Sequence, residues 1–237
     1  MEHEEYTAEN YPSFGKKYAD EKAIISLTSW KARINTVSKT LYSLVKQCPG
    51  FHIVLVLSEE EFPKMMDELP ENLKLFVDNE LIEVLWVYKN YRSFKKVLFT
   101  MDKYRDVPVI SADDDCIYTC NYAQMLYNEW NKNKNKIISF NKGFYFNKYY
   151  ICQGPCTLYP PHKIEMNLRL HLSLLKALNV GSHDDYFLSV LFKENPIALN
   201  KRPPFLFHDS LSPITIKSYN MIDRKKLFSL YEKCLFV

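Results

Sequence analysis

The stretch Ile53-Val54-Leu55-Val56-Leu57 decides the fold class, because it is an apolar run without alternating polar residues. Such runs are typical of parallel strands that helices cover on both faces. A helical pattern precedes the run over about 36–47, and Pro49-Gly50 makes the turn between them. The stretch therefore predicts an α/β fold built around a parallel sheet.

Strands and helices alternate on both sides of this run. We expect strands at 23–27, 82–87 and 107–112, a short helix within 63–70, and a longer helix around 94–101. Alternation of this kind predicts right-handed crossovers. The first half of the chain should thus form a mostly parallel, Rossmann-like sheet with helices on both faces.

The regular alternation of strands and helices is lost in the second half of the chain. The expected elements are a helix at 122–130, a hairpin of strands 137–140 and 144–146 through Asn141-Lys142-Gly143, and helices at about 164–178, 184–194 and 223–235. No internal repeat or linker divides the chain. We therefore expect a single domain over 1–237, with one functional half at about 23–118 and a smaller one at about 119–237.

Composition narrows the function classes. The 237 residues are 47% hydrophobic and 25% charged, as in soluble globular proteins. A net charge of +3 is too small to indicate nucleic-acid binding. No apolar run is long enough to cross a membrane, and the acidic start Met1-Glu2-His3-Glu4-Glu5 does not resemble a signal peptide, so we expect a cytoplasmic protein.

The cysteines are expected to stay reduced in that compartment. Cys116/Cys120 and Cys152/Cys156 each enclose three residues, whereas Cys-x-x-Cys is the commoner zinc spacing. Buried, inert thiols are the interpretation we prefer over a structural zinc site.

Three consecutive aspartates, Asp113, Asp114 and Asp115, follow the apolar run 107–112. Three like charges at the end of a buried strand are costly unless a cation lies there. Carboxylate oxygens suit Mg²⁺ or Mn²⁺, and ligands bind at the carboxyl ends of parallel strands. The run therefore predicts a metal site for a phosphorylated substrate; the alternative is a solvated acidic turn.

Other polar residues of the first half are expected near these aspartates. Thr28 and Ser29 end the first strand, so a nucleotide lying across the strand ends would meet their hydroxyls. Arg33 follows, and three interpretations of it are open. Its guanidinium group pairs with a phosphate or with an aspartate, or the residue is a surface arginine at the start of a helix. Of Lys95 and Lys96, one should face a diphosphate and the other solvent, and we prefer Lys95 for the diphosphate.

The second half carries another acidic pair, Asp184-Asp185, directly before the apolar stretch 186–191. The pair either caps a helix or supplies a carboxylate that positions or deprotonates an acceptor hydroxyl. His208 is either a third metal ligand or a structural hydrogen-bonding residue.

The chain resembles a family of bacterial polysaccharide and lipooligosaccharide glycosyltransferases. Its segment Ile24-Ile25-Ser26-Leu27-Thr28-Ser29-Trp30, followed by Arg33-Ile34, is similar to the family opening I-S-L-T-S-aromatic-x-x-R-I. Further matches are Leu55-Val56-Leu57-Ser58, Phe62-Pro63, Leu69-Pro70, Asn90, Ser93-Phe94-Lys95-Lys96, the aspartate run with Ile117-Tyr118, Leu158-Tyr159-Pro160-Pro161 and Asp184-Asp185. They keep the family order over about 23–191.

The resemblance implies a GT-A fold, with a nucleotide-sugar-binding half at about 23–118 and an acceptor-binding half at about 119–237. It implies that the DxD-type motif, 113–115, holds Mn²⁺ or Mg²⁺ against the donor diphosphate. Asp115 would be the main metal ligand, and Asp113 or Asp114 would contact the metal's waters or the donor.

By the same resemblance, Thr28 and Arg33 would lie by the nucleotide and Lys95 by the donor, with Asp184 or Asp185 at the acceptor side. The implied enzyme is a hexosyltransferase that moves a sugar from a nucleotide-sugar, UDP-linked by preference, to a glycan or lipid-linked hydroxyl. The segment Gln153-Gly154-Pro155-Cys156-Thr157 departs from the more glycine-rich family pattern.

Two alternatives remain beside this interpretation. One is a catalytically inactive glycosyltransferase-like scaffold, and the other is a metal-dependent phosphohydrolase of the haloacid-dehalogenase type, which also places aspartates after a strand. The basic, amphipathic stretch 224–235 either touches an anionic membrane at the inner face of the cell membrane or packs on the domain as an ordinary helix.

Overall fold

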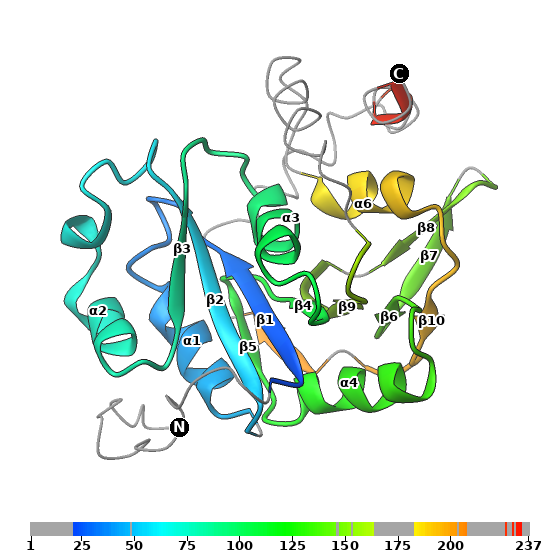
Figure 1. Ribbon diagram of the computed structural model, residues 1–237, viewed down its shortest axis with the longest axis horizontal. Helices are drawn as coiled ribbons and strands as arrows, with labels where there is room; N and C mark the ends of the chain where they lie inside the picture. The colour runs from blue at the N-terminus through cyan, green and yellow to red at the C-terminus, as the bar shows by residue number, and fades with distance from the viewer. Residues whose placement is uncertain are drawn as a thin grey trace.

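The computed structural model describes residues 21–47, 49–145, 147–152, 154–163, 183–202 and 204–207, together with 226, 229 and 231–233. Figure 1 shows a central sheet with helices packed against it. The helix that the sequence predicts at 164–178 lies outside the described residues, and so does most of the one predicted at 223–235.

The central sheet has seven strands in the order β10-β6-β9-β4-β1-β2-β3. They are β1 (Ala23–Thr28), β2 (Phe51–Ser58), β3 (Glu83–Val87), β4 (Val109–Ser111), β6 (Ile138–Ser139), β9 (Thr157–Tyr159) and β10 (Ile197–Ala198). β1 runs parallel to both of its neighbours, β2 and β4. β2 is also parallel to β3, and β6 is parallel to β10. Only β9 is antiparallel to its neighbours, β4 and β6. The prediction of a mostly parallel sheet is confirmed.

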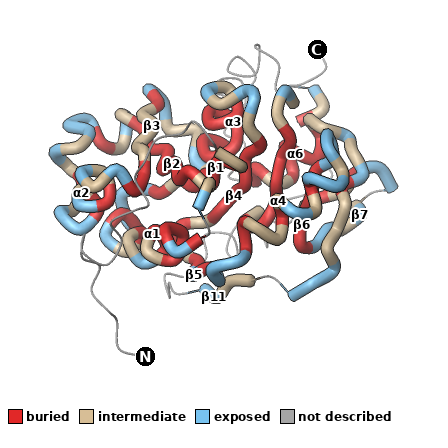
Figure 2. Tube along the Cα trace, turned by 60° about the horizontal axis from the view of Figure 1, so that its bottom comes forward, coloured by how far each residue is buried: buried red, intermediate tan, exposed pale blue. Residues whose placement is uncertain are grey.

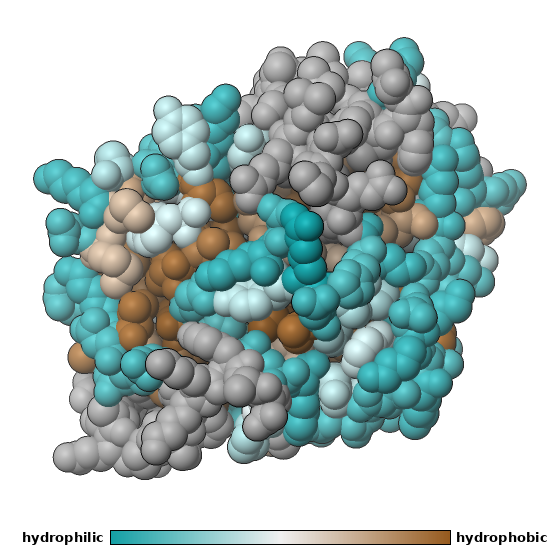
Figure 3. All heavy atoms as spheres, viewed as in Figure 1, coloured by the Kyte–Doolittle hydropathy of each residue, from teal (hydrophilic) through white to brown (hydrophobic). Residues whose placement is uncertain are grey.

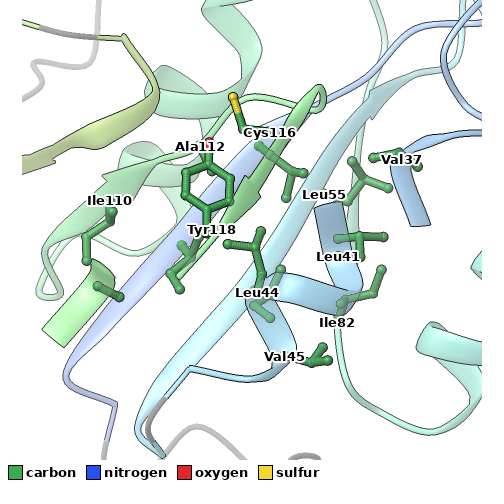
Figure 4. Packing of buried hydrophobic residues seen from close by; sticks show 14 of the residues in the cluster. Val37, Leu41, Leu44, Val45, Leu55, Ile82, Ile110, Ala112, Cys116 and Tyr118 are labelled. Carbon is green, nitrogen blue, oxygen red and sulfur yellow. The ribbon is translucent and has the colours of Figure 1, made fainter. Parts of the chain in front are cut away.

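Helices cover both faces of this sheet. On one face lie α1 (Val37–Val45), α2 (Glu71–Asp78) and α4 (Tyr122–Lys132); on the other lie α3 (Phe94–Lys103) and α6 (Asp184–Phe192). Because successive strand residues point to opposite faces, Ile25 packs with the first group and Ile24 with the second. Figure 4 shows side chains of α1 packed against side chains of β2 and β4, in the core on the α1 face of the sheet. Figure 2 shows that the central strands are buried along most of their length.

Several smaller elements complete the described chain. They are the 3-10 turns η2 (Met65–Glu68) and η3 (Gly154–Cys156), the antiparallel pair β5 (Cys116–Tyr118) and β11 (Phe205–Phe207), and the hairpin β7 (Lys142–Tyr145) with β8 (Tyr149–Cys152). The short helix expected within 63–70 corresponds to η2. The sequence interpretation missed α2, which begins directly after Pro70.

The predicted hairpin between 137–140 and 144–146 is wrong. Ile138–Ser139 joins the central sheet, where it pairs with β9 and β10. The hairpin forms instead between β7 and β8, so Gly143 lies in a strand rather than in a turn. The chain reverses near Asn147, whose φ of 52° is tolerated by asparagine better than by most residues.

The surface is unevenly polar on the face that Figure 3 shows. Hydrophilic residues cover most of its right-hand part, whereas hydrophobic residues gather on the left, over the region of the edge strand β3. Four of the five β3 residues are only partly buried, which agrees with the position of β3 at the edge of the sheet.

A cluster of titratable side chains lies where the parallel strands begin. The Glu83 carboxylate accepts hydrogen bonds from His52, Lys103 and Tyr104. Burial works against ionisation of Glu83, but these three bonds outweigh it and lower its pKa to about 2. The charge of Glu83 also acts on Glu21. Burial of Glu21, and then this charge, raise the Glu21 pKa from 4.5 to about 7.

Replacing Glu21 with glutamine should therefore stabilise the protein in a pH-dependent way. The folded state holds the Glu21 proton more tightly than the unfolded state, so wild-type stability falls as the pH rises from about 4.5 to about 7. Glu21 is only partly buried, so solvent screens part of this effect. We expect Glu21→Gln to gain about 1 kcal/mol, or 2–4 °C in melting temperature, at pH 8 and nothing at pH 4. An equal gain at both pH values would contradict the assignment.

Candidate active site

The aspartate run begins two residues after β4, and its middle residue is built into the core. The Asp114 carboxylate accepts a hydrogen bond from Ser29 Oγ at 2.6 Å and from Arg33 Nη1 at 2.9 Å. Thr40 Oγ1 donates to the Asp114 carbonyl at 2.9 Å. Asp114 therefore ties the end of β4 to the end of β1 and to α1. Burial raises its pKa, although Ser29 and Arg33 act in the opposite direction.

Arg33 is the cation that joins the middle and last aspartates. Its Nη1 lies 2.9 Å from Asp114 Oδ1 and 3.0 Å from Asp115 Oδ2, and only 10% of its side chain is exposed. The interpretation of Arg33 as a surface arginine is wrong. Of the two remaining possibilities, the structure shows the pairing with aspartates.

Asp113 is the most accessible of the three aspartates. Its side chain is 34% exposed, against 14% for Asp115 and 8% for Asp114. The Tyr118 hydroxyl accepts a hydrogen bond from the Asp113 backbone N–H at 2.7 Å, which fixes the loop. Asp113 thus presents its carboxylate from a held backbone, as a ligand-binding residue must.

Lys96 connects this loop to the second acidic pair. Its Nζ lies 2.5 Å from Asp113 Oδ1 and 3.2 Å from Asp184 Oδ2. Burial would lower the Lys96 pKa, but the two carboxylates outweigh burial and raise it, so the lysine stays charged. Asp113 and Asp184 are 71 positions apart in the sequence, but their shared contact with Lys96 places the two acidic clusters in one site.

The expectation that one of the two lysines is solvated is wrong, because both are buried. Lys95 Nζ contacts Glu61 Oε2 at 3.3 Å and Asn90 Oδ1 at 3.1 Å, and burial lowers its pKa. It is therefore Lys96 that touches the aspartates. Contact of Lys95 with a donor stays a prediction.

The acidic pair occupies the first turn of α6, as a helix-terminal interpretation requires. Asp184 also contacts Lys96, so it does more than complement the helix dipole. Asp185 Oδ1 accepts a hydrogen bond from the Tyr186 N–H at 3.0 Å. Burial, and then the charge of Asp184, raise the Asp185 pKa to about 7. A carboxyl group with this pKa can take up a proton at neutral pH.

The charges of the site are unbalanced. Among the described residues, the carboxylates of Asp113, Asp114, Asp115, Asp184 and Asp185 outnumber the cations that contact them, Arg33 and Lys96. Burial also raises the Asp115 pKa, as it does the pKa of Asp114 and Asp185, so the negative charges of these three carboxyl groups are unfavourable as they stand. A divalent cation would offset this excess.

The donor atoms fit a cation that the substrate helps to bind. No group of three or more His, Cys, Asp or Glu side chains among the described residues is arranged to hold a metal ion. Mg²⁺ is commonly bound through one or two carboxylates, with phosphate oxygens and water completing its shell. Asp113 and Asp115 can supply those carboxylates, and a diphosphate can supply the rest.

The remaining predicted residues have varied surroundings. Thr28 Oγ1 donates to the Val56 carbonyl at 2.7 Å, and the Ser29 hydroxyl is taken by Asp114, so direct donor contacts of both hydroxyls stay predictions. His208 lies outside the described residues. Cys116, Cys120, Cys152 and Cys156 are free thiols. No described helix has the length and apolar character needed to cross a membrane.

The C-terminal stretch is described at positions 226, 229 and 231–233. Tyr231 within it is fully buried and forms edge-to-face contacts with Phe94 and Phe187. At this point the stretch packs on the domain, as the ordinary-helix interpretation expects.

Asp114 should matter more for folding than any other aspartate of the run. Asp114→Ala would leave the buried Arg33 short of a partner and the Ser29 hydroxyl unsatisfied. Breaking a buried ion pair costs about 3–5 kcal/mol. Urea unfolding should show this loss, whereas Asp106→Ala, which removes an exposed partner of His162, should cost less than about 1 kcal/mol. Equal losses in the two variants would contradict the role of Asp114.

No family model matches the chain, and no curated protein matches it either. Among solved structures, S. aureus TarS 1–349 in complex with UDP-GlcNAc aligns over 77% of this chain and 57% of its own, with 13% identity and a TM-score of 0.48. The glycosyltransferase GlyE of Streptococcus pneumoniae TIGR4 aligns over 76% of this chain and 45% of its own, with 17% identity and a TM-score of 0.47. The chain thus spans between two fifths and three fifths of these structures.

Proposed function

We propose that this protein is a metal-dependent glycosyltransferase, which moves a hexosyl group from a nucleotide-sugar to a hydroxyl group of a glycan or lipid-linked acceptor. One observation carries the proposal: Asp113 after β4 and Asp184 at the start of α6 meet at Lys96, in a site where carboxylates outnumber cations among the described residues. Such a site suits a reaction that joins an anionic, metal-bound donor to a neutral alcohol. The sequence resemblance to glycosyltransferases supports the same conclusion.

The donor would lie across the carboxyl ends of β1 and β4, where ligands of α/β sheets bind. Asp113 and Asp115 would hold Mn²⁺ or Mg²⁺ together with the donor diphosphate. The bound cation would supply Lewis-acid stabilisation of the charge that develops on the leaving nucleoside diphosphate. Arg33 would keep Asp115 oriented, since it is fixed between Asp115 and the buried Asp114. UDP is the nucleotide we expect.

The acceptor would approach from the side of α6. A hydroxyl oxygen of the acceptor would form a bond to the anomeric carbon of the donor sugar, while the bond from that carbon to the diphosphate oxygen breaks. Asp185 would take the hydroxyl proton, because its pKa of about 7 matches a base that works at neutral pH. Asp184, held by Lys96, would position the acceptor.

Two other functions make different predictions. A catalytically inactive scaffold would bind the nucleotide and release no sugar. The pairing of Arg33 and Lys96 with the aspartates favours this function, because the two cations offset part of the aspartate charge without a metal. A phosphohydrolase would release inorganic phosphate from small phosphate esters.

Calorimetric titration with UDP tests the donor site. We expect UDP to bind in the presence of Mn²⁺ or Mg²⁺ and much more weakly in EDTA, because the diphosphate and the carboxylates repel one another without a cation. A wider set of nucleoside diphosphates would identify a different base preference. If none binds with either metal, the proposed donor site is wrong.

A further inference from the structure

Lys96 is anchored at both of its ends. Its backbone carbonyl accepts a hydrogen bond from Ser26 Oγ at 2.5 Å, and the same hydroxyl lies 2.8 Å from Thr100 Oγ1, so α3 is fastened to β1 at this point. At the other end, Nζ bonds to Asp113 and Asp184. With 4% of its side chain exposed, the lysine has little room for another arrangement.

The surroundings of α3 explain why this lysine is buried. α3 packs on the central sheet, and Phe94 at its start packs edge-to-face on Phe187 of α6 with ring centroids 5.3 Å apart. The first turn of α3 is thus packed on more than one side, so Lys95 and Lys96 are buried, whereas Lys103 at the other end of the helix is exposed. A buried ammonium group is costly unless carboxylates pair with it, and Asp113 and Asp184 meet that need from two different elements.

We propose that Lys96 is a positioning residue, which fixes the donor-side Asp113 and the acceptor-side Asp184 at one ammonium group and so sets the place of the acceptor relative to the donor. The assignment of these two sides rests on the proposed function. Without the ammonium group, the two carboxylates would repel each other, and the α6 end of the site would move away from the aspartate loop. Donor binding would change little, because Asp115 and Arg33 keep their contacts.

The first test compares kinetic constants of Lys96→Met and the wild type. Misplacing reacting groups by about 1 Å can cost about 10²-fold in rate. We expect kcat for sugar transfer to fall about 100-fold while KM for the donor stays within about threefold. The matched control is Lys103→Met on the same helix, whose ammonium group contacts Glu83 at the opposite edge of the sheet and whose loss should leave both constants unchanged. A kcat within twofold of wild type in Lys96→Met would overturn the proposal.

The second test needs no turnover. Removing Lys96 alone leaves the carboxylates of Asp113 and the buried Asp184 without the ammonium group between them, so removing the charge of Asp184 as well should relieve their repulsion. The double variant Lys96→Met/Asp184→Asn should thus melt at a higher temperature than Lys96→Met, although it carries one more substitution. A double variant that melts no higher would overturn the link between Lys96 and Asp184.

These readouts separate the two proposals. If the wild type turns over no sugar nucleotide, the proposed function fails, and the melting comparison still decides whether Lys96 joins the aspartates. If Lys96→Met is insoluble, Lys96→Gln, which keeps a polar end, takes its place in both tests with the same expected direction.

Discussion

Asp115→Asn is expected to reduce metal-dependent turnover about 10³-fold while the fold stays intact. Asparagine keeps the shape of the side chain but loses the charge that would bind the cation. A cation that stabilises the leaving diphosphate contributes several kcal/mol, and about 4 kcal/mol corresponds to 10³-fold in rate. The fold should survive, because Arg33 keeps its pairing with the buried Asp114.

Turnover of the variant should be measured over a series of Mn²⁺ concentrations, beside its melting curve. The apparent metal affinity should weaken, and the melting temperature should change by only a few degrees. Asp78→Asn is the matched control, because Asp78 is an exposed aspartate at the end of α2. Turnover of Asp115→Asn that equals that of Asp78→Asn would show that Asp115 is no metal ligand.

Asp185→Asn is expected to slow sugar transfer about 10²- to 10⁴-fold, the range typical of lost general-base catalysis. Its carboxyl group faces the charges of Asp184, Lys96 and Asp113. Only the ionised form accepts the acceptor proton, so wild-type activity should rise with pH through about 7 and then level off. The variant should lose this rise as well as the rate.

Asp185→Asn should lower activity but raise the stability of the folded protein. The Asp185 pKa is raised in the folded state, so this carboxyl group destabilises the protein increasingly as the pH rises from its ordinary value near 4 to about 7. Asp185→Asn should therefore melt higher than the wild type at pH 8 and at the same temperature at pH 3. Asp106→Asn, at an exposed position before β4, should change neither activity nor this difference. A variant with an unchanged pH–rate profile would rule out Asp185 as the base.

The fold was predictable where local pattern and tertiary structure agree. Continuous apolar runs identified β1 and β2, because both faces of these strands are buried. The hairpin was misplaced because Gly143 suggested a turn, whereas the reversal uses Asn147 in a positive-φ conformation. β6 is short and pairs with strands distant in sequence, and no local signal reveals such pairing.

The site was predictable in its residue types but less so in its contacts. A run of aspartates after an apolar strand is visible in the sequence, and so is an arginine after the neighbouring strand. The roles of Lys95 and Lys96 could not be predicted from the sequence, because the expectation that one of them is solvated assumes a helix packed on one side only. The first turn of α3 is packed on more than one side, and the contact of Lys96 with Asp184 spans 88 positions of the chain.

The central claim is that carboxylates at the end of β4 serve metal-dependent sugar transfer. It is tested most directly by release of nucleoside diphosphate from a panel of sugar nucleotides, with Mn²⁺, Mg²⁺ or EDTA, in the wild type and in Asp115→Asn. We expect slow hydrolysis of one donor even without acceptor, abolished by EDTA and by the substitution. Release that persists in EDTA would contradict metal dependence, and tight nucleotide binding with no release from any donor, with or without glycan acceptors, would contradict the transferase itself.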